Sequence, residues 1–130
     1  MKAKRIKSLK SLFNQEFLTD LLCTAMYDSS WFTCSVHKDT KYEVYKDANE
    51  KNMCIEDVWA YVLLNGGYIN VCDEEEGEEH RLALKDIIKG FENVMYNYPT
   101  MYANIRNEDY DLYDADAVIQ CAIFGEIVYG

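Results

Sequence analysis

The chain has 130 residues, of which 13 are basic and 23 acidic, and its formal net charge at neutral pH is −10. Apolar residues make up 49% and charged residues 28%, so the composition excludes a disordered chain, and the length suits one hydrophobic core. Because residues 11–130 hold only eight of the basic side chains, their surface repels phosphate, and we expect no direct nucleic-acid binding by this part.

The chain begins with a basic arm, residues 1–10, which we separate from a single acidic domain, residues 11–130. We interpret the arm as a solubilising terminus, with contact to nucleic acid or another anionic partner as the alternative. No segment approaches the roughly 18 uninterrupted apolar residues of a membrane span, and polar residues interrupt positions 11–22, unlike a signal sequence. We therefore expect a cytoplasmic protein that does not enter a membrane.

Two helices are predicted in the first half of the domain. Apolar residues from Leu12 to Met26 recur at three- and four-residue steps and predict an amphipathic helix, with Asn14 as its N-cap. Residues 31–46 alternate loosely and predict one or two strands. Apolar residues from Ile55 to Leu63 recur at helical spacing and predict a second helix with Trp59 buried, and the Asn-Gly-Gly sequence at 65–67 supplies the left-handed residue that ends it.

A β-hairpin with an acidic turn follows. Alternation over residues 68–72, and again at His80, Leu82 and Leu84, predicts two strands on either side of the turn. The turn contains six carboxylates, those of Asp73, Glu74, Glu75, Glu76, Glu78 and Glu79. Calcium needs oxygen ligands that converge, whereas contiguous acids in a turning chain point apart. We therefore interpret this run as a solvated hairpin tip and not as a metal site.

The remaining residues predict two more helices. One begins at about Lys85 and ends before Pro99, and the last runs from Ala115 to Ile123 and ends at Gly125. Residues 100–113 show no clear period, and residues 126–129 could add an edge strand. The expected fold is α+β, with about four helices packed on a small antiparallel sheet in a single domain.

The segment without a clear period carries a second acidic run in which tyrosines are interleaved. We single out Glu108, Asp109, Tyr110, Asp111, Tyr113 and Asp114. Tyrosine offers a large contact area at low entropic cost and is enriched in protein interfaces, so this run and the hairpin tip are our candidate interaction residues. The alternative is structural: the tyrosines cover the rim of the core, and Asp114 or Asp116 caps the last helix.

No pattern indicates catalysis or a resident cofactor. Both histidines, His37 and His80, have charged neighbours, and neither a nucleophile elbow nor a glycine-rich phosphate loop occurs. With 23 acids, a pair of carboxylates at a suitable separation has no specificity. A zinc site built on Cys34 and His37 would need its other two ligands from His80 or a distant cysteine, and no closely spaced pair supplies them. We expect no enzyme, no metal and no cofactor, and an undetected enzyme or metal protein is the last alternative.

The cysteines are expected to be reduced. Five occur, an odd number, and they are widely separated, without a CxxC pair: Cys23, Cys34, Cys54, Cys72 and Cys121. In a reducing compartment such residues are mostly buried thiols. We therefore predict that the chain forms no disulfide.

Residues 58–91 and 114–130 resemble a loose group of small uncharacterised proteins encoded by bacteriophages and integrated mobile elements of Gram-positive gut bacteria. The matching positions are Trp59, Gly66, Gly67, Asp73, Leu82, Leu84, Gly90, Asp116, Gln120, Phe124 and Gly125. These are turn and core residues, not catalytic groups. Ala83 departs from the pattern, since Thr or Ser is expected there as a helix cap. The resemblance implies an origin more than an activity.

Short acidic phage proteins often occupy the nucleic-acid groove of a host enzyme, including defence nucleases of the CRISPR type, and the acidic composition of this chain fits that role. We expect a non-enzymatic interaction protein that binds a host macromolecule, a protein with a basic surface, and acts as an inhibitor or nucleic-acid mimic. The alternative is a phage replication or assembly accessory protein that works as an oligomer. A mimic should present one contiguous acidic face, and an oligomeric accessory a large apolar patch.

Overall fold

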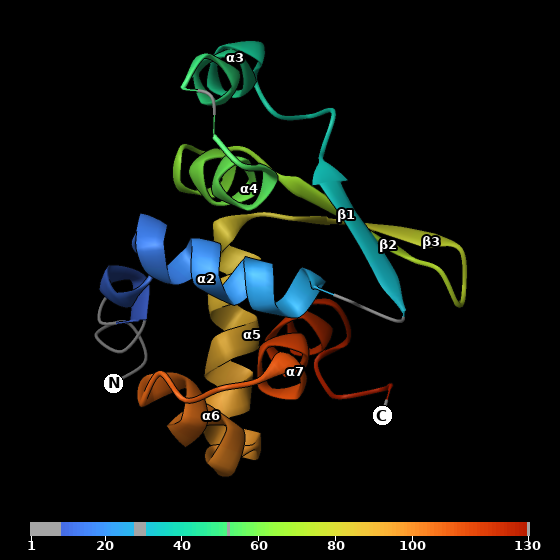
Figure 1. Cartoon of the computed structure of the whole chain (residues 1–130). Helices are drawn as coiled ribbons and strands as arrows, with labels where there is room; N and C mark the ends of the chain where they lie inside the picture. The colour runs from blue at the N-terminus through green and yellow to red at the C-terminus, as the bar shows by residue number, and fades with distance from the viewer. Residues whose placement is uncertain (1–8, 28–30, 52, 130) are drawn as a thin grey trace.

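The computed structural model describes residues 9–27, 31–51 and 53–129 (Figure 1). Its elements in chain order are α2 (Gln15–Met26), β1 (Phe32–Val36), α3 (Tyr42–Glu50), α4 (Ile55–Leu64), β2 (Ile69–Asp73), β3 (Glu78–Leu82), α5 (Leu84–Asn97), α6 (Pro99–Arg106) and α7 (Leu112–Phe124). The α+β class is confirmed, but these residues form six helices of eight or more residues, not about four. Most of the predicted basic arm lies outside the described residues.

The three strands form one antiparallel sheet in the order β1-β2-β3, which confirms the hairpin. Phe32 of β1 is opposite Asp73 of β2, and Ile69 of β2 is opposite Leu82 of β3. Because side chains alternate along a strand, Ile69, Val71 and Asp73 share one face of β2, and all three are buried. The helices cover this face, and the other face carries exposed residues such as Ser35 of β1.

Helices α5 and α7 pack with their backbones close together. A Cβ atom added at Gly90 would lie 2.4 Å from the carbonyl oxygen of Val118, so only glycine fits at this crossing. Across α5, the ring of Phe91 meets that of Phe13 edge to face, at 5.3 Å between centroids. Leu9 also belongs to this core, with 4% of its surface exposed. Within the described ranges, no helix is both long and apolar enough to cross a membrane.

Several predicted helix boundaries are confirmed. The side chain of Asn14 accepts a hydrogen bond from the N–H of Phe17 at 2.9 Å, which makes it the N-cap of α2. Gly66 follows α4 with a φ of 84°, a backbone conformation that favours glycine. Trp59 of α4 is buried, as its periodicity predicted. The third predicted helix is α5. Its N-cap, Ala83, has no side-chain acceptor for the helix N–H groups, but Asp86 accepts a hydrogen bond from the N–H of Ala83 at 2.8 Å.

Two helices and the end of the chain differ from the prediction. For residues 31–46 one or two strands were predicted. β1 confirms one of them, but residues 42–46 lie in α3, which places Val44 and Ala48 on one face against Val58 and Val62 of α4. Helix α6 was not predicted, because Pro99 ends one helix and is also the first residue of the next. The predicted edge strand at 126–129 is also wrong, since the sheet contains only β1, β2 and β3 among the described residues.

Candidate functional site

The first acidic run forms the turn of the β2–β3 hairpin, which projects at one end of the molecule (Figure 1). Gly77 has a φ of 72°, and its N–H donates to the carbonyl oxygen of Asp73 at 2.7 Å, which closes the turn. Five carboxylates of this run are exposed: Glu74, Glu75, Glu76, Glu78 and Glu79. The predicted solvated tip is therefore confirmed for these five residues.

Asp73 is not part of the exposed tip, because only 1% of its surface is accessible. Its side chain lies on the covered face of β2, as the alternation with Ile69 and Val71 requires. One carboxylate oxygen accepts hydrogen bonds from the N–H groups of Glu75 at 2.9 Å and Glu76 at 3.2 Å. The prediction that Asp73 is solvated with its neighbours is wrong. Its carboxylate is the internal acceptor that holds the turn.

The other oxygen of Asp73 accepts a hydrogen bond from the hydroxyl of Tyr129 at 2.8 Å. Burial raises the pKa of Asp73, but the bonds from Tyr129 and from the backbone of Glu76 and Glu75 outweigh it and hold this pKa below its ordinary value. The same bond raises the pKa of Tyr129 to about 12. At neutral pH the pair therefore consists of a carboxylate and a neutral phenol.

Tyr129 reaches Asp73 because the side chain of Gln120 holds the C-terminal segment. Gln120 is 1% exposed, and its oxygen accepts hydrogen bonds from the N–H groups of Val128 at 2.7 Å and Tyr129 at 2.8 Å. Its amide nitrogen donates to the carbonyl oxygen of Tyr129 at 3.1 Å and to the carboxylate of Asp116 at 2.6 Å. One amide side chain thus supplies the bonds that the predicted edge strand would have made.

Trp31 completes this arrangement. Its indole N–H donates to the second oxygen of Asp116 at 2.6 Å, and its ring lies 5.1 Å from the ring of Tyr129. Burial raises the pKa of Asp116. We call Trp31, Asp73, Asp116, Gln120 and Tyr129 the tail network. It connects the residue before β1, the hairpin tip, α7 and the C-terminal segment. Through Asp73 it holds the backbone of the hairpin tip from its buried side.

The second acidic run covers the connection between α6 and α7 and the first residues of α7. Asp111 is the N-cap of α7 and accepts a hydrogen bond from the N–H of Asp114 at 3.1 Å. Asp114 is 6% exposed and accepts from the N–H of Asp111 and the amide of Asn104, both at 3.2 Å. The N-cap is Asp111 and the side chain of Asp114 completes a capping box, so the predicted cap is confirmed in part for Asp114 and is wrong for Asp116. Burial removes Asp114 from any contact surface.

The other members of the second run differ in exposure. Glu108, Asp109 and Tyr113 face solvent, whereas Tyr110 is half-buried and burial raises its pKa. Glu108 and Tyr110 line a hollow against α2, together with Glu16, Asp20 and Cys23. Burial and then Glu56, Asp20 and Asp57 raise the pKa of Cys23, so its thiol is not an activated nucleophile.

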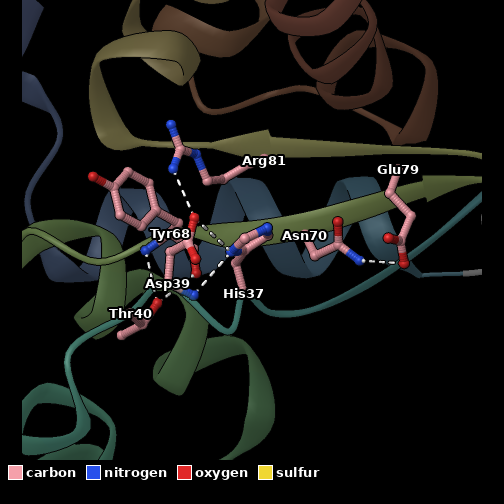
Figure 2. A network of polar contacts seen from close by, with 7 residues as sticks. All are labelled: His37, Asp39, Thr40, Tyr68, Asn70, Glu79 and Arg81. Carbon is pink, nitrogen blue, oxygen red and sulfur yellow. Dashed lines mark hydrogen bonds and ion pairs between the residues drawn. The ribbon is translucent and has the colours of Figure 1, made fainter.

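A group of polar residues that the sequence did not predict lies at the open end of the hairpin (Figure 2). Arg81 of β3 donates to the carboxylate of Asp39 at 2.7 Å, lowers the pKa of Asp39, and lies 4.6 Å from the ring centroid of Tyr68. The hydroxyl of Thr40 donates to the carbonyl oxygen of Tyr68 and accepts from its N–H, both at 3.0 Å. Asp39 also donates its N–H to Nδ1 of His37 at 3.0 Å.

We call His37, Asp39, Thr40, Tyr68 and Arg81 the turn network. It attaches the turn between β1 and α3 to the hairpin, and so it fixes where α3 begins. Single residues 42 positions apart in sequence carry no pattern, so no sequence signal indicated that Asp39 and Arg81 form an ion pair. On the same face of the sheet, Asn70 donates to Glu79 at 3.3 Å (Figure 2).

The described residues offer no arranged metal centre, because no three His, Cys, Asp or Glu side chains among them are placed to hold an ion. All five cysteines are free thiols. Burial raises the pKa of Cys34, Cys72 and Cys121, the last to about 11, so these thiols stay protonated at neutral pH.

Comparison with protein-family models, with curated proteins and with solved structures finds no match. The resemblance to phage and mobile-element proteins therefore stays a prediction. The structure does assign physical roles to several residues that carry it: Gly66 and Gly125 have left-handed backbones, Gly90 allows a helix crossing, and Gln120 holds the C-terminal segment. A function has to be argued from the surface of the chain itself.

Proposed function

We propose that the chain is a small non-enzymatic binding module that uses its hairpin tip to contact a basic surface on a host protein. The observation that carries the proposal is the group of five exposed glutamates on one turn, whose backbone Asp73 holds from inside. A turn that is already ordered loses little conformational entropy when it binds. Complementary charge speeds the encounter with a basic partner and helps to exclude acidic ones.

The two acidic runs do not support the nucleic-acid mimic equally well. A mimic of an extended duplex calls for one contiguous acidic face, whereas in the second run Asp114 is buried and Asp111 caps α7, so fewer of its acids are available to a partner than at the hairpin tip. We therefore favour recognition of a compact basic site on a protein. Inhibition of a nucleic-acid-handling or defence enzyme remains the form that this role would take if the chain has the phage origin that the resemblance implies.

The proposal is tested by neutralising the tip. In the variant Glu74→Gln, Glu75→Gln, Glu76→Gln, Glu78→Gln and Glu79→Gln, the fold should stay intact, because exposed like charges contribute little to stability. The parent is used to capture proteins from host lysate at low and high salt, and the captured partner is identified and purified. Its association rate with the variant should fall about tenfold or more, with a shallower salt dependence.

A matched control removes five exposed acids elsewhere, so that the net charge is the same. It amidates Glu16, Asp20, Glu50, Glu108 and Asp109, which are all exposed. The proposal expects this control to bind the purified partner as the parent does. Equal loss in both variants would show that only net charge matters, and unchanged binding by the tip variant would exclude the tip. A calcium-induced rise in melting temperature that only the tip variant lacks would identify the glutamates as ligands.

A further inference from the structure

A groove runs along the outer edge of β1, on the side away from β2. Residues 34–38 form one wall of the groove, and Tyr42 and Tyr45 of α3 and Ile55 of α4 form the other. Neither the hairpin tip nor the second acidic run lines it. The groove is therefore a separate surface, and its properties are independent of the function proposed above.

The β1 wall offers backbone hydrogen bonds. In an antiparallel pair, alternate residues bond to the partner strand. The carbonyl oxygen of Trp31 accepts from Glu74 at 2.8 Å and the N–H of His37 donates to Tyr68 at 2.9 Å, so the odd-numbered residues of this segment face β2. The N–H and C=O groups of Cys34 and Val36 therefore point to the outer edge. None of these four groups has a hydrogen-bond partner among the residues that the structure describes.

The opposite wall is apolar and open to solvent. Tyr42 is 71% exposed, Ile55 53% and Tyr45 41%. The described ranges contain seven large apolar side chains with such exposure, and three of them meet in this one groove. Exposed apolar groups that gather beside free strand edges are the features that strand-binding domains use.

The turn network fixes the distance between the two walls. Thr40 binds both backbone groups of Tyr68, and Arg81 holds Asp39, so the segment that leads from β1 into α3 is attached to the sheet at two points (Figure 2). Because this segment carries Tyr42 at its end, the tyrosine wall is already in place before anything binds. A ready-made groove binds an extended segment with less entropic loss.

The charges around the groove favour an acidic occupant. Lys38 lines the groove, is exposed, and makes no ion pair with the described residues. Among the described residues no carboxylate lines the groove, although the chain as a whole has a net charge of −10. The nearest acid in sequence, Asp39, is held by Arg81.

We propose that this groove binds an extended segment of a partner protein, which adds a strand to β1, packs apolar side chains on Tyr42, Tyr45 and Ile55, and places a carboxylate near Lys38. A second copy of the chain is a poorer occupant. Its own β1 edge lies inside its own groove, opposite its own α3, so pairing two β1 strands would force both tyrosine walls together.

The probe for this proposal is a displayed library of random linear peptides, selected on the intact chain. Enriched peptides should alternate apolar and other residues and carry an acidic residue or a free terminal carboxylate. The most enriched peptide is then synthesised and titrated. In the complex, hydrogen exchange should slow at the N–H groups of Cys34 and Val36, whereas Thr33 and Ser35, which already face β2, should change little.

Variants of exposed residues separate the groove from other surfaces without unfolding the chain. Tyr42→Ala combined with Ile55→Ala should weaken peptide binding about tenfold, as should Lys38→Glu. Tyr27→Ala is the matched control, because Tyr27 is 78% exposed and does not line the groove. The five-glutamine tip variant should bind the peptide as the parent does, which distinguishes this proposal from the function assigned to the tip.

Three results would overturn the proposal. The first is a library that yields no enriched family of peptides. The second is an enriched peptide that binds both groove variants as tightly as it binds the parent. The third is protection of Cys34 and Val36 that grows with protein concentration in the absence of peptide, because a second copy would then occupy the edge.

Discussion

The two acidic runs are similar in composition, yet the structure uses them differently. At the hairpin tip, Asp73 alone turns inward, and the glutamates around Gly77 project into solvent. Between α6 and α7, Asp111 and Asp114 bind each other's backbone N–H groups at the start of a helix. A helix start leaves several N–H groups without acceptors, whereas a hairpin turn leaves fewer. Acids at the helix start therefore become structural, and acids at the turn stay available to a partner.

The largest expected effect comes from Gln120→Leu, which should test whether the tip depends on the tail network. The free energy of unfolding should fall by roughly 1–3 kcal/mol, because the N–H groups of Val128 and Tyr129 lose their acceptor. Chemical denaturation measures this loss. Asn93→Ala is the control, since its bond to the carbonyl oxygen of Gly125 holds the same segment from an exposed position.

Amide hydrogen exchange in the Gln120→Leu variant tests whether the two acidic runs are independent of each other. Hydrogen exchange at Glu75 and Glu76 should become faster, because Tyr129 no longer orients Asp73. Exchange at Asp114 should not change, because its bond to Asp111 is independent of the C-terminal segment. Equal acceleration at both places would show that the two runs are not separate structural units.

Asp73→Ala should lower the melting temperature more than any single alanine substitution of the exposed glutamates in the same run. Three donors lose their acceptor in this variant: the N–H groups of Glu75 and Glu76 and the hydroxyl of Tyr129. Glu78→Ala is the matched comparison, since it removes an equal charge from the solvated side of the turn. Thermal melts of the two variants at neutral pH decide this, and similar melting temperatures would place Asp73 among the exposed acids after all.

In the second run, Asp111→Ala should reduce the free energy of unfolding by about 1 kcal/mol, within the range of about 0.5–2 kcal/mol that lost N-caps give. Asp109→Ala, two residues earlier and exposed, should change it by less than about 0.5 kcal/mol. Urea denaturation of both variants measures the difference. A null result for Asp111→Ala would mean that the run is as solvated as the hairpin tip.

A pH-dependent effect is expected in alkali, at the bond between Tyr129 and Asp73. Because the folded pKa of Tyr129 is about 12, above its ordinary value near 10, its contribution to stability is complete below pH 10 and is lost as the pH rises towards 12. Subtracting the stability curve of Tyr129→Phe from that of the parent should isolate this loss. A difference that stays constant from pH 9 to about pH 12 would contradict the bond between Tyr129 and Asp73.

Periodicity predicted the four longest helices well and failed on the two shortest, α3 and α6. The helices α2, α4, α5 and α7 each bury a stripe of several apolar residues, which a period of 3.6 reveals. In α3 only Ala48 is fully buried, and in α6 only Ile105, so neither helix has a stripe to detect. Packing against neighbours decides the conformation of such segments more than local propensity does.

Only part of the candidate site could be predicted from the sequence. Asp73 has the same parity in β2 as Ile69 and Val71, so its burial could have been deduced from the hairpin alone. The role of Gln120 could not, because it depends on a segment that folds back onto α7 and on a carboxylate that Trp31 also binds. Polar contacts between distant residues leave no periodic signal.

The position of Trp31 makes it an intrinsic fluorescence probe of the C-terminal segment. The chain has two tryptophans, and Trp59→Phe would leave Trp31 as the only one. Its indole N–H binds Asp116 and its ring lies against Tyr129. Detachment of the C-terminal segment would expose this ring to water and shift its fluorescence emission to longer wavelength. The fluorescence of Trp31 therefore reports how fast the C-terminal segment detaches from the hairpin tip and returns to it, without an attached dye.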